Sequence, residues 1–282
     1  MTCEVKVIED SINPNNEIRV TTLELRYWRA IHSEFMTHRV FSRNASSSRA
    51  IPVKTMIKQV WNNPAMPVYW GKNQAGMKAR TELSSFKIAL SKFVWVSASK
   101  VACIFAYLLT YIGLHKQVSN RLIEPWQYIS VIATSTEWDN FFGLRDHADA
   151  QPEIRELAIA MKKAMDQSKP EYRELHLPYI SDKERETIED ISILKQISTA
   201  RCARVSYLTH DGKNPSIDRD IKLHNDLVAS RPIHASPLEH QLTANTSKDF
   251  VRNVRGWTQY RVELEQEIYN RSEEHTSELQ SH

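Results

Sequence analysis

Glycine is scarce in this chain, and no other sequence feature constrains the fold more. Only 6 of the 282 residues are glycine. A dinucleotide-binding loop of the G-x-G-x-x-G type needs three closely spaced glycines, and the chain has no such group. Gly71 and Gly76 have the spacing of a phosphate-binding P-loop, but Met77 replaces the lysine that must follow. Any nucleotide phosphate must therefore be held by side chains such as arginine.

The composition is that of an ordinary globular protein, with 41% hydrophobic and 25% charged residues. The net charge of +3 is too small to indicate a nucleic-acid-binding domain. Cys3, Cys103 and Cys202 are widely spaced and odd in number, which argues against a disulfide framework and a zinc site. No other metal motif is present. We expect a protein of the reducing cytoplasm.

No membrane segment or signal peptide is expected. The N-terminus lacks the basic-then-apolar pattern of a signal. The most apolar run, Val101 to Leu114, is shorter than the roughly 20 residues of a membrane span, so it predicts a core helix. The last residues, 271–282, resemble the translation of a DNA-sequencing adapter, and we set them apart as a non-native tail, with a genuine charged tail as the alternative.

The first half of the chain predicts strands and helices in alternation. Arg19 to Arg26 has the mixture of a half-buried strand. The spacing of Trp28, Ile31 and Phe35 predicts a helix that leads to Glu34 and His38. The serines and asparagine from Ser42 to Ser48 favour an irregular loop.

The next segments predict a long loop, long helices and a strand. Residues 62–76 form a loop with exposed Tyr69 and Trp70, either a lid or a plain connection. Apolar spacing from Leu83 to Leu108 indicates one or two long helices. Tyr128 to Thr136 is typical of a buried strand.

The second half predicts three further helices. Pro152 suits the first turn of a helix whose apolar face includes Ile154 and Met161. Ser181 and Glu184 form a capping box, and Ser216 is the expected N-cap of another helix. Without repeats or linkers, residues 1–270 are expected to form one α+β domain with a small mixed or antiparallel sheet and several long helices.

The stretch "THRVFSRNASSSR" contains a histidine-arginine pair, then seven residues, then Ser47. This resembles the R-H-R, seven residues, Ser signature of the flavin-dependent thymidylate synthases. Three further blocks are similar to the same family: Asn120 to Ala158 with N-F-x-x-L-R, Ala200 to Gly212 with A-R-V-S, and His234 to Ala244 with H-x-[ST]-P-[FL]-E-H. The four blocks cover roughly 130 residues, so chance agreement is hard to accept.

The blocks occur in an unusual order. In better-known members, the A-R-V-S and P-x-E-H blocks come first and the P-x-E-H strand continues into the helix with the histidine and arginine. Here these blocks come last, so the chain resembles a circularly permuted form of the fold. The resemblance implies that residues 1–165 are the motif and helical part and that residues 181–270 match the usual N-terminal region of the family. Leu238 to Ala244 should then lie near Val20 to Leu25 in space.

The resemblance implies conversion of dUMP to dTMP, with methylenetetrahydrofolate as carbon donor and NADPH as reductant through bound FAD. It implies a cytoplasmic homotetramer, in a bacterium or a phage-infected cell, with sites at subunit interfaces and no nucleic-acid or membrane partner. Matched positions assign Glu34, Ser47, Ser48, Arg49, Arg121 and Arg145 to dUMP, with Ser47 and Arg145 as the catalytic pair. They assign His38, Arg39, Asn44, Asn140, Asp149, Ser206, Ser236 and Glu239 to FAD.

Several positions depart from the family pattern. Thr37 stands where the motif has its first arginine, Ala45 where glutamate is usual, and Asp149 where histidine is usual. Glu34 replaces a usual glutamine. This pattern resembles phage-borne members. The alternatives are a non-catalytic, arginine-rich nucleotide- or RNA-binding module and an inactive homologue.

Overall fold

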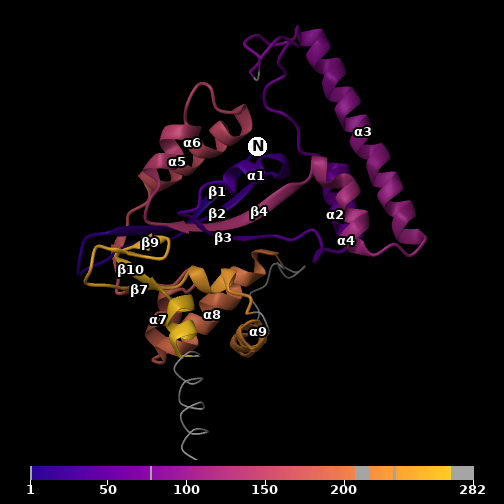
Figure 1. The fold of residues 1–282 in the computed structure, drawn as a ribbon. Helices are drawn as coiled ribbons and strands as arrows, with labels where there is room; N and C mark the ends of the chain where they lie inside the picture. Colours follow the sequence, from indigo (N-terminus) through magenta and orange to yellow (C-terminus); the bar gives the residue numbers. More distant parts are fainter. Residues whose placement is uncertain (1, 77, 207–215, 231–232, 268–282) are drawn as a thin grey trace, which may run out of the picture.

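The computed structural model describes residues 2–76, 78–206, 216–230 and 233–267, arranged as a mixed α/β fold (Figure 1). Its strands are β1 (Glu4–Ile12), β2 (Arg19–Trp28), β3 (Ser42–Ala45), β4 (Tyr128–Ser135), β5 (Glu171–Tyr172), β6 (Leu175–His176), β7 (Leu242–Ala244), β8 (Phe250–Val251), β9 (Val254–Arg255) and β10 (Trp257–Gln259). Its α-helices are α1 (His32–Phe35), α2 (Val53–Asn62), α3 (Ser85–Tyr111), α4 (Lys116–Ser119), α5 (Asp139–Arg145), α6 (Pro152–Gln167), α7 (Asp182–Thr187), α8 (Ile191–Ala203) and α9 (Ile217–Ala229). The described residues also form four 3-10 helices: η1 (Arg29–Ile31), η2 (Asn120–Trp126), η3 (Arg204–Ser206) and η4 (Ser236–Glu239).

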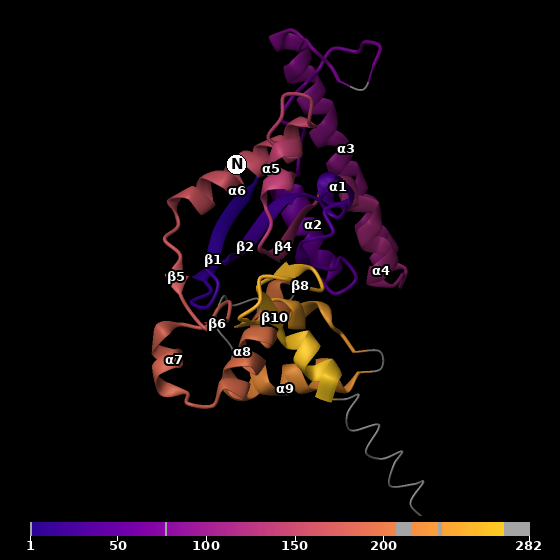
Figure 2. The same cartoon turned by 60° about the vertical axis from the view of Figure 1, so that its left-hand side comes forward.

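A five-stranded sheet forms the centre of the molecule, with strand order β3-β4-β2-β1-β5. All neighbours are antiparallel except β1 and β5. Figures 1 and 2 show α5 and α6 on one side of this sheet and α7, α8 and α9 on the other. The predicted strands at Arg19–Arg26 and Tyr128–Thr136 are confirmed as β2 and β4, which pair with each other.

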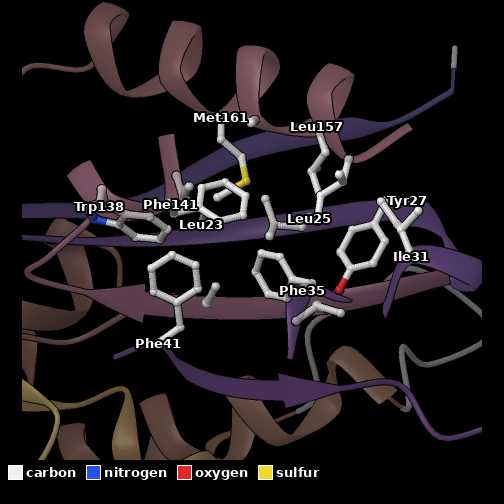
Figure 3. Packing of buried hydrophobic residues seen from close by; sticks show 14 of the residues in the cluster. Leu23, Leu25, Tyr27, Ile31, Phe35, Phe41, Trp138, Phe141, Leu157 and Met161 are labelled. Atoms are coloured by element: carbon white, nitrogen blue, oxygen red, sulfur yellow. The ribbon is translucent and has the colours of Figure 1, made fainter. Parts of the chain in front are cut away.

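The main core lies between this sheet and α5–α6. Leu23, Leu25 and Tyr27 of β2 face Phe141 of α5 and Met161 of α6, and all are buried (Figure 3). The apolar face predicted for α6 is confirmed, because its side chains Ile154, Leu157, Ala158, Met161 and Met165 are all buried. Pro152 occupies the first turn, where its missing N–H costs nothing.

A second sheet, β10-β7-β6, packs against the end of β2. Val20 of β2 shares a buried cluster with Leu242 of β7 and Trp257 of β10. Thr134 of β4 also hydrogen-bonds both Thr22, over 2.6 Å, and His240, over 2.8 Å. The two segments expected to be neighbours are therefore close in space, although β7 belongs to a different sheet from β2. The permuted chain order stays a prediction.

The loop predicted from Ser42 to Ser48 is wrong for its first half. Residues Ser42–Ala45 form β3, which pairs antiparallel with β4, with Ser42 opposite Thr134 and Ala45 opposite Val131. Hydrogen bonds to a neighbouring strand satisfy the backbone that polar side chains would otherwise compete for. Local polarity therefore did not decide the conformation.

The helix predicted from Trp28 is also much shorter than expected. Trp28 ends β2, and only η1 and the single turn of α1 follow before the chain turns at Met36. Ile31 and Phe35 do share a buried face, as their spacing predicted. Pairing of β2 with β4 up to Trp28 and Tyr128 leaves no room for the first helical turn.

The core helix predicted over Val101–Leu114 is wrong in its burial. This segment belongs to α3, a single helix of 27 residues. Only Ser99, Ala102, Cys103 and Ala106 of α3 are buried. Phe105, like many of its large apolar side chains, is more than half exposed. By length and composition alone, α3 would suffice to cross a membrane.

The helices predicted in the second half are present. Ser181 and Glu184 form the complete capping box at the start of α7, as predicted. Ser216 precedes α9, but its side chain makes no capping hydrogen bond. Asp220, in the first turn of α9, is buried and paired with Arg201 and Arg204. The suspected tail, 271–282, lies outside the described residues.

Candidate active site

Arg145, at the end of α5, meets the turn that follows α1. Its Nε donates to Nε2 of His38 over 3.0 Å, and its Nη1 forms an ion pair with Glu34. Its Nη2 lies 3.4 Å from the hydroxyl of Thr37. Residues more than 100 positions apart in the sequence, from the first and second blocks, therefore form one charged cluster.

His38 is fixed within this cluster and is only 6% exposed. Its ring lies 4.9 Å from that of Phe141 and 5.8 Å from that of Phe41, measured between centroids. Burial, and then the positive charges of Arg145 and Arg43, lower the pKa of His38 below its ordinary value. His38 is therefore neutral at pH 7, and its Nε2 is free of a proton and accepts from Arg145.

Asn44, on β3, joins the first block to the two blocks at the end of the sequence. Its Nδ2 donates to the backbone carbonyl of Cys202 over 2.8 Å, at the end of α8. The hydroxyl of Ser236, on η4, donates to its Oδ1 over 3.3 Å. The edge strand β3, absent from the sequence prediction, is what brings these polar groups together. Ser206, which was assigned with them, ends η3.

Glu239 lies on η4 in the same region and is paired with a residue that the sequence did not single out. Its Oε1 accepts from Nη1 of Arg261 over 2.5 Å. Arg261 also holds Glu265, at 2.9 Å. The i, i+4 spacing of Arg261 and Glu265 is visible in the sequence. The contact of Arg261 with Glu239 depends on tertiary structure.

Ser48 belongs to a further group around Glu124, a residue that the sequence pattern did not single out. The Ser48 hydroxyl donates to Oε1 of Glu124 over 2.8 Å, and Nδ2 of Asn120 donates to the Ser48 carbonyl over 2.6 Å. Arg121 and Arg29 lie 3.8 and 3.4 Å from the Glu124 carboxylate. The i, i+3 spacing of Arg121 and Glu124 could have indicated this pair.

Ser47, Arg49 and Arg39 are less engaged. The Ser47 hydroxyl accepts from the backbone N–H of Arg49 over 3.3 Å. The side chains of Arg39 and Arg49 are exposed, and neither makes a hydrogen bond or ion pair within the described part of the chain. Both guanidinium groups are thus available to an anion.

An open pocket of about 1320 Å³ lies beside the Arg145 cluster. Glu34 and Arg145 line it together with Tyr69 from the predicted loop. Asp149 also lines the pocket, and its carboxylate lies 3.3 Å from the Lys78 ammonium. Trp70 instead has its ring 6.3 Å from that of Trp95. A lid function for this loop remains a hypothesis.

Most of the predicted residues therefore fall into three groups. They are the Arg145 cluster with the pocket, the Asn44 group and the Ser48 group. Among the described residues, no hydrogen bond or ion pair joins one group to another.

The fit to a flavin within one chain is partial. Asn44, Ser236 and Glu239 offer amide, hydroxyl and carboxylate groups side by side. Asn140 lies on α5, on the opposite side of the central sheet from α8 (Figure 2). Asp149 follows α5 and faces the pocket. A complete flavin site would need groups from more than one of these places.

No protein-family model matches the sequence, and no curated protein matches it. Among solved structures, a UMP/dUMP methylase, PolB from Streptomyces cacaoi, bound with 5-Br dUMP, is similar at 15% identity with a TM-score of 0.44, over 58% of this chain and 90% of that chain. Thymidylate Synthase X (ThyX) from Helicobacter pylori, with FAD and dUMP, is similar at 17% identity with a TM-score of 0.35, over 52% of this chain and 67% of that chain. At these TM-scores, the function of this chain has to be argued from its own residues.

Proposed function

We propose that this chain is a nucleotide methyltransferase that converts dUMP to dTMP in the manner of the flavin-dependent thymidylate synthases. One observation carries the proposal: residues of the four sequence blocks meet through side-chain hydrogen bonds. Arg145 of the second block bonds His38 of the first, and Asn44 of the first bonds Cys202 of the third and Ser236 of the fourth. Blocks that were recognised only by their letters thus converge in space.

The arginines suit a nucleotide phosphate. Guanidinium groups are permanently charged and planar, so they bind phosphate in a bidentate manner. Arg145 is held in place by His38 and Glu34, which removes part of the entropic cost of ordering it on binding. Exposed Arg49 and Arg121 would add further charge, from the Ser48 group. We include Ser47 and Ser48 as hydrogen-bonding groups for the same substrate.

The thiols of the chain are poorly suited to nucleophilic catalysis. Burial raises the pKa of Cys103 and Cys202, and also that of Cys3. A thiol is nucleophilic only as thiolate, so none of the three is activated. Among the described residues, the Ser47 hydroxyl contacts no base that could activate it, and it accepts a hydrogen bond from the backbone N–H of Arg49. These features agree with a reaction that uses no covalent bond to the enzyme.

A bound flavin would supply the reducing equivalents, with NADPH as their source and methylenetetrahydrofolate as the carbon donor. Asn44, Ser236 and Glu239 would hold its polar groups, with Arg39, Asn140, Asp149 and Ser206 as further candidates. His38, neutral and anchored to Arg145, would keep that guanidinium in position. We further propose that residues 1–270 act as one catalytic domain, in a cytoplasmic homotetramer.

The direct test is to incubate purified protein with dUMP, methylenetetrahydrofolate and NADPH and to separate the products by chromatography. Formation of dTMP, together with flavin absorbance that is released on denaturation, is the expected result. Asn44→Ala should lower flavin content, whereas Asn15→Ala, at an exposed turn, should not. Complementation of a thymidine-requiring bacterium is an independent check.

A specific outcome would replace this proposal. Exposed Arg39 and Arg49 also suit a binding module without catalysis. Colourless protein that forms no dTMP and binds RNA with a steep salt dependence would favour that module. Colourless protein that binds dUMP but forms no dTMP would indicate an inactive homologue.

A further inference from the structure

Helix α3 has two apolar faces, and the described residues of the chain cover only one of them. Ser99, Ala102 and Cys103 face α2 and η2 and are buried. The opposite face carries large side chains that are 48% to 82% exposed; we call them the α3 stripe: Phe86, Leu90, Phe93, Val94, Val101, Ile104, Phe105, Leu108, Tyr111 and Ile112. At about 3.6 residues per turn, these positions fall on one side of the helix. Figure 1 shows α3 along one side of the molecule, with α2 and α4 beside its lower part.

A stripe of this size is unusual on a monomer. A large apolar or aromatic side chain has roughly 150–250 Å² to bury, so ten such residues at these exposures present on the order of 1,000 Å². The largest apolar patch of a typical monomer is about 300–600 Å². A stable interface buries about 800 Å² on each partner, which the stripe can supply.

The order of residues in the stripe is symmetric about position 99. Four pairs of apolar positions lie at equal distances on either side of it: Phe86 with Ile112, Leu90 with Leu108, Phe93 with Phe105, and Val94 with Ile104. Tyr111 is the exception, since its counterpart is Lys87. Ser97 and Val101 flank the centre. Two copies of the stripe laid antiparallel would therefore place the side chains of these four pairs level with one another, with the small Ser97 near the centre, where the helices are closest.

We propose that α3 pairs antiparallel with α3 of a second copy of this chain, about a two-fold axis level with residue 99. A two-fold interface uses the same surface on both partners, which the symmetric stripe satisfies. Exposed Lys87 borders the stripe, but its counterpart about position 99 is Tyr111, and no two lysines of α3 would lie level in the pair, so like-charge repulsion does not oppose the pairing. The interface holds whether or not the chain methylates dUMP, since it depends on α3 alone.

A lipid bilayer fits the same surface less well. Lys100 lies near the middle of α3, where a lysine in a membrane-spanning helix strongly opposes insertion. Its ammonium lies 4.5 Å from the ring centroid of Trp61, on α2. Helix α2, packed along α3, also carries exposed Lys54 and Lys58. A bilayer around α3 would have to accommodate these charges.

Cysteine cross-linking tests the orientation. In a Cys3→Ser background, Cys103 and Cys202 are buried, so the introduced thiol is the reactive one. Ser97→Cys, next to the axis, should form a disulfide-linked dimer on mild oxidation. Phe86→Cys alone should not, but a mixture of Phe86→Cys with Ile112→Cys should. Equal self-linking at all three positions would mean a parallel pair and overturn the proposal.

Light scattering, which measures the molar mass in solution, tests whether the α3 stripe forms the interface. Wild-type protein should be a dimer or a higher even oligomer, and Phe93→Asp should reduce its mass at least twofold. Phe250→Asp, at a phenylalanine on β8 that is 52% exposed, is the matched control and should leave the mass unchanged. A monomeric wild type, or an oligomer that Phe93→Asp leaves intact, would overturn the proposal. Flotation with neutral phospholipid vesicles that Phe93→Asp abolishes would assign the stripe to a membrane instead.

Discussion

Arg145 Nε donates a hydrogen bond to Nε2 of His38 over 3.0 Å, and the same guanidinium pairs with Glu34. The arrangement requires a neutral His38, which burial and the neighbouring arginines enforce by lowering its pKa. A positive charge is thereby held rigidly at the edge of the pocket. This relationship gives the proposed substrate site its most direct tests.

Arg145→Ala should abolish dUMP turnover and leave flavin bound. Loss of charge-assisted hydrogen bonds corresponds to roughly 1.5–3 kcal/mol, or about a 10- to 100-fold weaker dUMP affinity. Calorimetric titration with dUMP measures the affinity, and absorbance measures the flavin. Arg155→Ala serves as the control, because Arg155 lines the same pocket. Unchanged dUMP affinity in Arg145→Ala would contradict the assigned role.

Glu34→Gln should strengthen dUMP binding by about 2- to 5-fold. The Glu34 carboxylate competes with a phosphate for the Arg145 guanidinium, and a partly exposed ion pair is worth up to about 1 kcal/mol. The dUMP affinity of Glu34→Gln is compared with that of Glu156→Gln, a substitution at another residue that lines the pocket. Weaker binding in Glu34→Gln would show that the carboxylate contacts the substrate itself.

The stability of the fold should decrease as the pH falls below about 6.5. His176 and His240 are fully buried in a hydrogen-bonded chain through Thr22 and Thr134. Burial lowers the pKa of His240 to about 3 and that of His176 well below its ordinary value. In the unfolded chain both histidines have the ordinary pKa of about 6.5. At pH values between the lowered pKa and 6.5, the unfolded chain therefore binds more protons than the folded chain, so acid favours unfolding.

The expected loss is on the order of 2 kcal/mol per buried histidine between pH 7.5 and pH 5. Denaturant unfolding at the two pH values measures it. Glu9 acts in the opposite sense, because burial raises its pKa to about 7. The measurement is therefore the change in the free energy of unfolding between the two pH values, compared between His240→Asn and the exposed control His147→Asn. An equal change in both variants would argue against His240 as a source of the loss of stability in acid.

Gly256→Ala should lower the free energy of unfolding by about 2 kcal/mol or more. Gly256 has φ of +73°, which costs an L residue roughly 1–2 kcal/mol. A Cβ there would also lie 2.7 Å from Nδ2 of Asn16 and from Cδ1 of Ile18. Gly143→Ala on α5 meets nothing within 4 Å and should be neutral or stabilising by up to ~1 kcal/mol. Thermal or denaturant unfolding of both variants decides the point.

Helix α6 shows what sequence reasoning could predict. Its apolar residues recur at three- and four-residue spacing after Pro152, and the structure buries that face. The capping box of Ser181 and Glu184 was equally predictable, because both partners lie within one turn. In each case the physical cause acts over a few residues, so the sequence displays it directly.

Strand β3 and the exposure of α3 could not be predicted in this way. The polar run from Ser42 becomes a strand only because β4, some 90 positions later, offers a free edge. Nothing within α3 reveals which of its apolar residues the rest of the chain will cover. Burial depends on neighbours that are distant in sequence.

For the candidate site, the sequence by itself determined which side chains are available. They are arginines in place of a glycine-rich phosphate loop, His38 and Asn44 in the first block, and Ser236 in the last. Tertiary structure decided their grouping. It joined Arg145 to His38 and Asn44 to Cys202, added Glu124 and Arg261, and kept the Ser48 group separate. The residue types set the chemistry that is available, whereas hydrogen bonds form only between groups that packing of the distant segments brings within about 3 Å.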